Sequence, residues 1–308
     1  MDLPFEHTST YRLRHYECDA NGHVNNANYV RYVLETHVRA LAAVGQDPGR
    51  LVATNRAWQV RELFIEYLRP LTFGDSLTVK ATLDDLAESR AQWTCECRNT
   101  ASGELCAQSQ LEFEFLDTIS GQSRPLPPAV ADSLVPPEDP PAVLRHSRFP
   151  SLPPRPAGAV SSPWQIQWRD VGPDLLLHGA TYLDYLSDFL TLAAAAAGRS
   201  FHHDIEDELG WVIRRQWLRI MEPAALGRGL RLSTWISDIK RVTVMRHFTI
   251  HAQDNGALRP SSERAAQDDA LMGEAHTLWV CVDPRSGRPA RIPETFMQGF
   301  APQISGGR

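Results

Sequence analysis

The sequence predicts an α+β protein in which one structural unit occurs twice, each time as an antiparallel sheet wrapped around a central helix. Three observations support this prediction: an internal repeat, a proline-rich stretch between the two copies, and the same order of helix and strand patterns in each copy. The 308 residues and 43% apolar content are enough to form one large or two small hydrophobic cores.

The repeat has an offset of 153 residues and needs no gap from Tyr29 to Leu77. Such ungapped agreement indicates two copies of one unit. The matching pairs are Tyr29/Tyr182, Tyr32/Tyr185, Gly45/Gly198, Trp58/Trp211, Arg61/Arg214, Pro70/Pro223, Gly74/Gly227 and Leu77/Leu230. Further along the offset becomes 166, so that Asp117 matches Asp283. The extra residues are expected in a polar loop over Gln253–Asp269.

The stretch between the copies contains the Pro-Pro pairs 136–137, 140–141 and 153–154. Proline at this density is incompatible with a helix or a central strand, so the stretch is expected to be a linker on the surface. The predicted division is a first domain over 1–127, a linker over 128–160 and a second domain over 161–308.

Hydrophobic periodicity assigns the elements of the first copy. Tyr11–Glu17 alternates like a strand, and Asn26–Ala43 has apolar residues at helical spacing. Four more strands are expected over Trp58–Tyr67, Ser76–Leu83, Ala91–Cys97 and Cys106–Leu116. In the last of these, apolar residues alternate with Gln110, Glu112 and Glu114, which predicts a half-buried antiparallel strand.

Composition excludes several classes of function. The net charge is −6 and no run of five basic residues occurs, so no general attraction for nucleic acid or anionic lipid is expected. The first residues lack the pattern of a signal peptide, and the apolar stretch Leu190–Gly198 is too short to span a membrane. Five cysteines without zinc-site spacing favour a reducing cytoplasmic location, with no metal and no cofactor.

Residues 15–35 read HYECDANGHVNNANYVRYVLE. This stretch resembles the 4-hydroxybenzoyl-CoA thioesterase-like branch of the hot dog superfamily. The pattern Asp19-x-Asn21-x-His23-Val-Asn-Asn also resembles the acyl-ACP thioesterases, which are tandem hot dogs, and a weaker resemblance extends over Arg61–Asp75. The resemblance implies a tandem (double) hot dog fold and hydrolysis of an acyl-CoA or acyl-ACP thioester to free acid and thiol. It also implies a hot dog pair within the chain; further homodimerisation stays open.

Two departures from these families bear on activity. Gly172 falls where Asp19 lies in the first copy, so the resemblance supports one active copy. The acid that acyl-ACP thioesterases carry downstream is missing, because Pro70 falls near its place. Asp170 and Asp174 lie on either side of Gly172 in the second copy, and either would replace the missing acid only after a shift of register.

The first copy contains the groups that thioester hydrolysis needs. Asp19 is the candidate nucleophile or general base, with Asn21 and His23 positioning it, the water or the carbonyl. The helix that begins near Asn26 presents unpaired N–H groups to the carbonyl oxygen, and Gly22 allows close approach. The residues expected to bind substrate are Gly22, Val24, Asn25, Asn26 and Tyr29.

Each of these residues also has a structural interpretation. Asp19 and Asn21 beside a glycine are ordinary turn formers, and Asn25 and Asn26 are ordinary helix caps. Tyr29 and Tyr32 recur in the second copy as Tyr182 and Tyr185, which favours a packing role for both. A non-catalytic hot dog pair that binds acyl thioesters is the alternative function. A hot dog dehydratase would pair an acid with a histidine in a pattern that this sequence lacks.

Overall fold

The computed structural model describes residues 5–138, 143–199, 209–253 and 270–306. They form two compact units: Met1–Arg148 with Asp170–Leu183, and Phe149–Arg169 with Asp184–Arg308. Each unit is built on a hot dog sheet and helix, so the chain is a double hot dog, and each unit is treated by itself below. Most of the loop predicted over Gln253–Asp269 lies outside the described residues.

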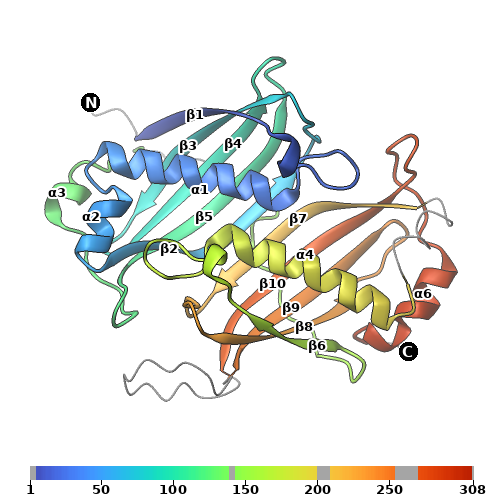
Figure 1. Ribbon diagram of the computed structural model, residues 1–308. Coiled ribbons are helices and arrows are strands. Elements are labelled where there is room, and N and C mark those ends of the chain that lie inside the picture. Colours follow the sequence, from blue (N-terminus) through green and yellow to red (C-terminus); the bar gives the residue numbers. More distant parts are fainter. Residues whose placement is uncertain (1–4, 139–142, 200–208, 254–269, 307–308) are drawn as a thin grey trace. The chain divides into compact units, whose positions relative to one another are not determined.

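The sheet of the first unit has the order β1-β3-β4-β5-β2, and its pairs are antiparallel. Helix α1 lies across one face of this sheet, as Figure 1 shows. The elements are β1 (Glu6–Arg12), η1 (His15–Glu17), α1 (Asn26–Ala43), α2 (Pro48–Ala53), β2 (Arg56–Tyr67), β3 (Ser76–Leu86), β4 (Arg90–Asn99), β5 (Leu105–Asp117) and α3 (Pro128–Ala131).

Helix α1 has the predicted bounds because both its cap and its apolar stripe are strong local signals. The side chain of Asn25 accepts a hydrogen bond from the backbone N–H of Ala27, which caps the helix. The stripe formed by Val30, Val33 and Ala40 is completely buried against the sheet.

The prediction of a strand over Tyr11–Glu17 was wrong beyond Arg12. After β1 the chain turns into the short helix η1, because the Glu17 carboxylate accepts hydrogen bonds from the backbone N–H of Arg14 at 2.7 Å and from the Tyr32 hydroxyl at 2.5 Å. The bond to Tyr32 joins η1 to α1, so the chain after Arg12 does not continue as a strand. Helix α2 was not predicted, although Asp47 caps it and Pro48 begins it.

Two further expectations fail for identifiable reasons. The stretch from 128 onward was expected to lack helix, but α3 begins at Pro128, where a helix needs no N–H, and Val130 and Leu134 are buried. The alternation in β5 assigned Glu114 to the polar face of a half-buried strand, but its side chain is only 4% exposed. Its carboxylate is paired with Arg61 at 2.5 Å, which compensates the buried charge.

The sheet of the second unit has the corresponding order β7-β10-β9-β8-β6. Its elements are β6 (Val160–Gln165), η2 (Trp168–Asp170), α4 (Gly179–Ala196), β7 (Gly210–Ile220), β8 (Gly229–Ser237), β9 (Thr243–Gln253), β10 (Leu271–Val282), α6 (Glu294–Phe300) and η3 (Ala301–Gln303). The last residue of η2 and the first residues of α4 are grouped with the first unit. No helix in the described part of the chain is long and apolar enough to cross a bilayer.

The two sheets share an irregularity that supports the repeat. In the pair β2–β5 the register shifts at Arg61, between Val60 and Glu62. In the pair β7–β10 it shifts at Arg214, between Ile213 and Arg215. A bulge at matching positions is a feature of one unit present twice.

Candidate active site

The turn between η1 and α1 is built around Asp19. One carboxylate oxygen, Oδ1, accepts hydrogen bonds from the backbone N–H groups of Asn21 at 2.8 Å and His23 at 3.2 Å. The backbone N–H of Asp19 also donates to the carbonyl of His23, at 2.7 Å. The side chain is exposed, and within the described residues the other oxygen, Oδ2, has no hydrogen bond. One oxygen therefore holds the turn and the other faces solvent.

Gly22 gives the turn its shape. Its φ of +77° lies in the left-handed region that favours glycine, and a Cβ placed there would meet no atom within 4 Å. The space over this residue is open, as close approach of a ligand requires.

The start of α1 leaves one backbone donor available beside this turn. The N–H of Ala27 is capped by the Asn25 side chain, and the N–H of Asn28 donates to the Asn25 carbonyl. No described group accepts from the N–H of Asn26. A free N–H at the positive end of a helix is a suitable donor for a developing oxyanion.

The segment after β2 forms the wall on the other side of the turn. Val24 donates through its backbone N–H to the Leu71 carbonyl at 2.8 Å, and His23 pairs with Thr72. The Tyr29 hydroxyl accepts from the Leu71 N–H at 3.0 Å, and its ring packs edge-on against Tyr67. Burial raises the pKa of both tyrosines, so they remain neutral hydrogen-bonding groups.

The predicted residues thus lie in the turn and in the first two turns of α1, but they differ in burial and in hydrogen bonding. Asn21 is exposed and His23 is half-buried, and no described group bonds to either side chain. Val24 and Tyr29 are 3% exposed each, so they shape the wall from within the core. Asn25 caps α1, and the carbonyl of Asn26 accepts from the Tyr67 hydroxyl at 3.1 Å.

Sequence reasoning missed Glu17 as part of this region. Its carboxylate bonds to Tyr32, and its backbone carbonyl accepts from the Asn28 side chain at 2.8 Å. Burial raises the pKa of Tyr32, and the adjacent Glu17 carboxylate adds to that effect. A glutamate three residues after Arg14, at the spacing of a capping box, was the available signal.

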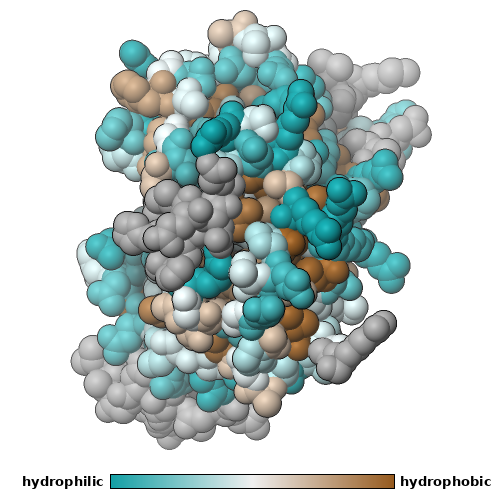
Figure 2. Space-filling view, turned by 90° about the vertical axis from the view of Figure 1, so that its right-hand side faces the viewer, coloured by the Kyte–Doolittle hydropathy of each residue, from teal (hydrophilic) through white to brown (hydrophobic). Residues whose placement is uncertain are grey.

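Aromatic side chains surround the turn on the surface. Tyr16 is 73% exposed and Phe73 is 61% exposed, and the His15 ring packs edge-on against Phe73. On the face drawn in Figure 2, apolar side chains reach the surface in patches interrupted by hydrophilic ones. Such small patches are usual on a protein surface.

The second copy repeats the turn with a different residue supplying the carboxylate. Gly172 and Leu175 occupy the places of Asp19 and Gly22, and Leu175 has a left-handed φ of +62°. The Oδ1 of Asp174 accepts from the Leu176 N–H at 3.1 Å and lies 2.9 Å from where a Cβ on Gly172 would be. Its Oδ2 accepts from the Gln59 side chain at 3.0 Å.

Comparison with known proteins shows what this chain is similar to. Residues 13–134 match the model of the thioesterase-like superfamily. Residues 13–134 are a thioesterase-like domain. A Synechocystis protein named as an esterase is 24% identical over 125 residues, which cover 40% of this chain and 75% of that protein. The chloroplastic acyl-acyl carrier protein thioesterase ATL3 of Arabidopsis thaliana is 31% identical over 84 residues, 27% of this chain and 44% of that protein.

The likeness in fold extends beyond the thioesterase-like domain. A crystal structure of a Lactobacillus plantarum protein assigned as an oleoyl thioesterase superposes with a TM-score of 0.69 at 14% identity. The match covers 94% of this chain and 98% of that one, so both copies take part. Within the described residues, no group of three or more His, Cys, Asp or Glu side chains could hold a metal ion.

Proposed function

We propose that this chain hydrolyses an acyl thioester of coenzyme A or acyl carrier protein at the turn between η1 and α1. The observation that carries the proposal is that the two carboxylate oxygens of Asp19 differ in their hydrogen bonds. Its Oδ1 is held by two backbone N–H groups, while its Oδ2 has no hydrogen bond within the described residues, in a turn that leads into α1. A fixed carboxylate with one available oxygen can act as a base or a nucleophile.

In the reaction the thioester carbonyl oxygen accepts a hydrogen bond from the Asn26 N–H. Asp19 Oδ2 removes a proton from water as the water oxygen adds to the carbonyl carbon. The C–S bond then breaks, the thiolate takes the proton, and the products are a carboxylic acid and a free thiol. Stabilisation of the oxyanion by one such donor typically contributes about 3 kcal/mol. In a nucleophilic variant, Oδ2 itself attacks and water hydrolyses the resulting anhydride.

Asn21 and His23 are the remaining polar groups of the reacting centre. Both lie in the loop that Asp19 closes, and their side chains are available to the attacking water or to the leaving sulfur. Val24 and Tyr29 form the wall that receives the first carbons of the acyl chain. Gly22 leaves room for the thioester to approach.

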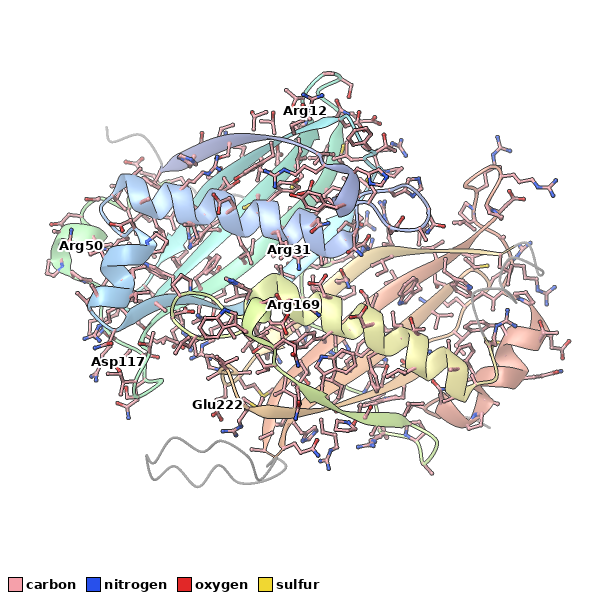
Figure 3. The ribbon with its side chains drawn as sticks, in the orientation of Figure 1. Arg12, Arg31, Arg50, Asp117, Arg169 and Glu222 are labelled. Atoms are coloured by element: carbon pink, nitrogen blue, oxygen red, sulfur yellow. The ribbon has the colours of Figure 1, made fainter. Side chains whose placement is uncertain are left out.

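The carrier's phosphate is expected to meet arginines on the same side of the domain. Arg12 ends β1, just before η1, and Arg31 lies on α1 in its second turn; both are exposed. Figure 3 labels these two arginines, together with Arg50 on α2. Guanidinium groups bind phosphate strongly. The free thiols of all five cysteines fit a reducing cytoplasmic setting.

The test is thiol release from a panel of acyl-CoA and acyl-ACP substrates of graded chain length. Asp19→Asn and Asp19→Ala are expected to lower kcat/KM about 10³-fold, the usual size of a lost acid–base or nucleophilic group. Asp174→Asn is the matched control, because it neutralises the corresponding carboxylate of the second copy and is expected to leave kcat/KM unchanged.

Two results would contradict the proposal. If the wild type released no thiol from any substrate but bound acyl thioesters, the chain would be the non-catalytic binding protein. If both Asp19 variants retained full activity, the reacting group would lie elsewhere. Circular dichroism of each variant separates loss of chemistry from loss of fold.

A further inference from the structure

The loop that carries Asp19 is closed at its base by Glu17 and Asn25. The Asn25 N–H donates to the Glu17 carbonyl at 2.8 Å. Inside this pair, the Asp19 N–H donates to the His23 carbonyl at 2.7 Å. The loop therefore leaves and rejoins the rest of the unit at one pair of residues, and whatever holds that pair also fixes the orientation of the loop.

Glu17 joins this base to both η1 and α1. Its carboxylate Oε2 accepts hydrogen bonds from the Arg14 N–H at 2.7 Å and from the Tyr32 hydroxyl at 2.5 Å. Its backbone carbonyl accepts a further bond from the Asn28 side chain at 2.8 Å. Hydrogen bonds to an ionised group are roughly twice as strong as those between neutral groups. Glu17 is thus bonded to the segment before η1, to the residue that caps α1 and to the first two turns of that helix.

These bonds fix two groups of the proposed reaction relative to each other. Asp19 follows Glu17 by two residues, and the Asn26 N–H belongs to the residue after Asn25, which bonds to Glu17. Without the side-chain bonds of Glu17, the loop would be free to tilt about its base. A misplacement of about 1 Å at a reacting group can lower the rate about 10²-fold. Glu17 is therefore placed to affect the rate without contacting the substrate.

The second copy has a similar base under a loop that lacks the reacting aspartate. Asp170 and Tyr185 occupy the places of Glu17 and Tyr32. The His178 N–H donates to the Asp170 carbonyl at 3.1 Å, as the matching pair does in the first copy. An acid at this place is therefore a feature of the repeated unit. It is expected to matter for catalysis only in the copy whose loop carries a reacting carboxylate.

We propose that Glu17 is a positioning residue: it holds the loop of Asp19 against the start of α1. Its effect on catalysis rests on the proposed function, whereas its hold on the loop can be measured without turnover. Its other oxygen, Oε1, has no hydrogen bond within the described residues. A glutamine can therefore keep both bonds through its carbonyl oxygen and place its amide nitrogen where no bond is lost.

The kinetic test compares Glu17→Ala with Glu17→Gln in steady-state thiol release, with rates divided by the folded fraction. Glu17→Ala is expected to lower kcat about 10²-fold and to change KM less than about threefold, because the reacting groups are displaced while the binding surface is kept. Glu17→Gln is expected to keep kcat within about fivefold of wild type, because its hydrogen bonds remain. This rescue distinguishes positioning from acid–base chemistry, in which the neutral amide would fail as it does in Asp19→Asn.

A second pair of variants tests the tyrosine bond. Tyr32→Phe removes one of the two bonds to Oε2 and is expected to lower kcat about tenfold. Tyr185→Phe is the matched control, because it removes the corresponding hydroxyl of the second copy and is expected to leave kcat and KM unchanged. If Glu17→Ala does not fold, Tyr32→Phe takes its place in the comparison.

Amide hydrogen exchange measures the hold on the loop without turnover. The Asp19 and Asn25 N–H groups, which bond across the loop, are expected to exchange at least about tenfold faster in Glu17→Ala and near the wild-type rate in Glu17→Gln. Unchanged exchange in folded Glu17→Ala would overturn the proposal. Faster exchange with unchanged kcat would overturn the catalytic role, and equal losses of kcat in both variants would make Glu17 a chemical group instead. A wild type without turnover would contradict the proposed function, and exchange would still decide whether Glu17 holds the loop.

Discussion

The turns before α1 and α4 have nearly the same backbone but use their carboxylates differently. In the first, Asp19 Oδ1 closes the turn and Oδ2 has no hydrogen bond within the described residues. In the second, Asp174 Oδ1 closes the turn and Oδ2 is occupied by the Gln59 amide. The comparison teaches that each turn uses one carboxylate oxygen to hold its backbone, whereas the proposed chemistry needs a second oxygen without a hydrogen bond. The structural and the catalytic interpretations of Asp19 therefore apply to different atoms of one group.

The largest expected effect comes from converting the first turn into the second. The double variant Asp19→Gly/Asn21→Asp keeps a carboxylate in the turn but moves its point of attachment by two residues. The turn should form, while kcat/KM should fall about 10³-fold, as for a missing catalytic group. Steady-state kinetics with the preferred thioester measures this. Retention of more than a tenth of the activity would show that position within the turn is unimportant.

The next effect concerns the arginine at each bulge. Arg61→Met removes the shorter of the two ion pairs of Glu114, which is 4% exposed and keeps Ser123 and Arg90 as partners, and breaking such a pair costs about 3 kcal/mol. Arg214→Met strands no carboxylate at the matching place, where Val280 stands instead of Glu114, and should therefore cost less. Urea unfolding monitors both. Arg69→Met, which removes an ion pair that is mostly exposed, is the control and should cost less than about 1 kcal/mol.

A third difference is the pH response of matching positions on the sheets. In the first unit the Thr94 hydroxyl donates to Asp84 at 2.5 Å, and burial raises the pKa of Asp84 to about 6. In the second unit Ser237 and His247 occupy these positions, 2.6 Å apart, and burial lowers the pKa of His247 to about 4.

These shifts act in opposite directions. Asp84 binds its proton more tightly in the folded than in the unfolded chain. Its contribution to the free energy of unfolding is therefore fully present below about pH 4 and is lost as the pH rises through 6. Folded His247 resists its proton, so the second unit loses stability as the pH falls from about 6.5 toward 4. Asp84→Asn should stabilise the chain by about 2 kcal/mol at pH 8 and have little effect at pH 4. Equal gains at both pH values in urea unfolding would contradict this assignment.

The smallest effect concerns the left-handed residue of each turn. A leucine in this conformation costs roughly 1 kcal/mol, so Leu175→Gly should stabilise the chain by up to about that amount. Gly22→Leu should destabilise it by a similar amount. Thermal melts of the two variants measure both changes in stability. A destabilising Leu175→Gly would mean that the leucine side chain, although 48% exposed, makes contacts that outweigh its strain.

The parts of the fold that depend on local signals were predictable. Helix α1 was placed correctly because Asn25 and the apolar stripe act within one segment. The segment after Arg12 was misassigned because its conformation depends on Tyr32, which is 15 residues from Glu17 in the chain. The role of Asp19 was predicted through its motif and stays a prediction. The bond between Gln59 and Asp174 joins residues 115 apart and has no signature in sequence.

The bulge at Arg61 and Arg214 has a consequence for how such a chain can change. A bulge adds one residue to one strand, so that residue can be deleted while the pairs beyond it, from Glu62 opposite Glu112 onward, keep their partners and their faces of the sheet. In β2 the residues that keep their places include Leu63 and Ile65, both in the core. Deletion of a paired residue would instead move the following side chains to the opposite face, so these strands can be shortened by one residue at the bulge but not beside it.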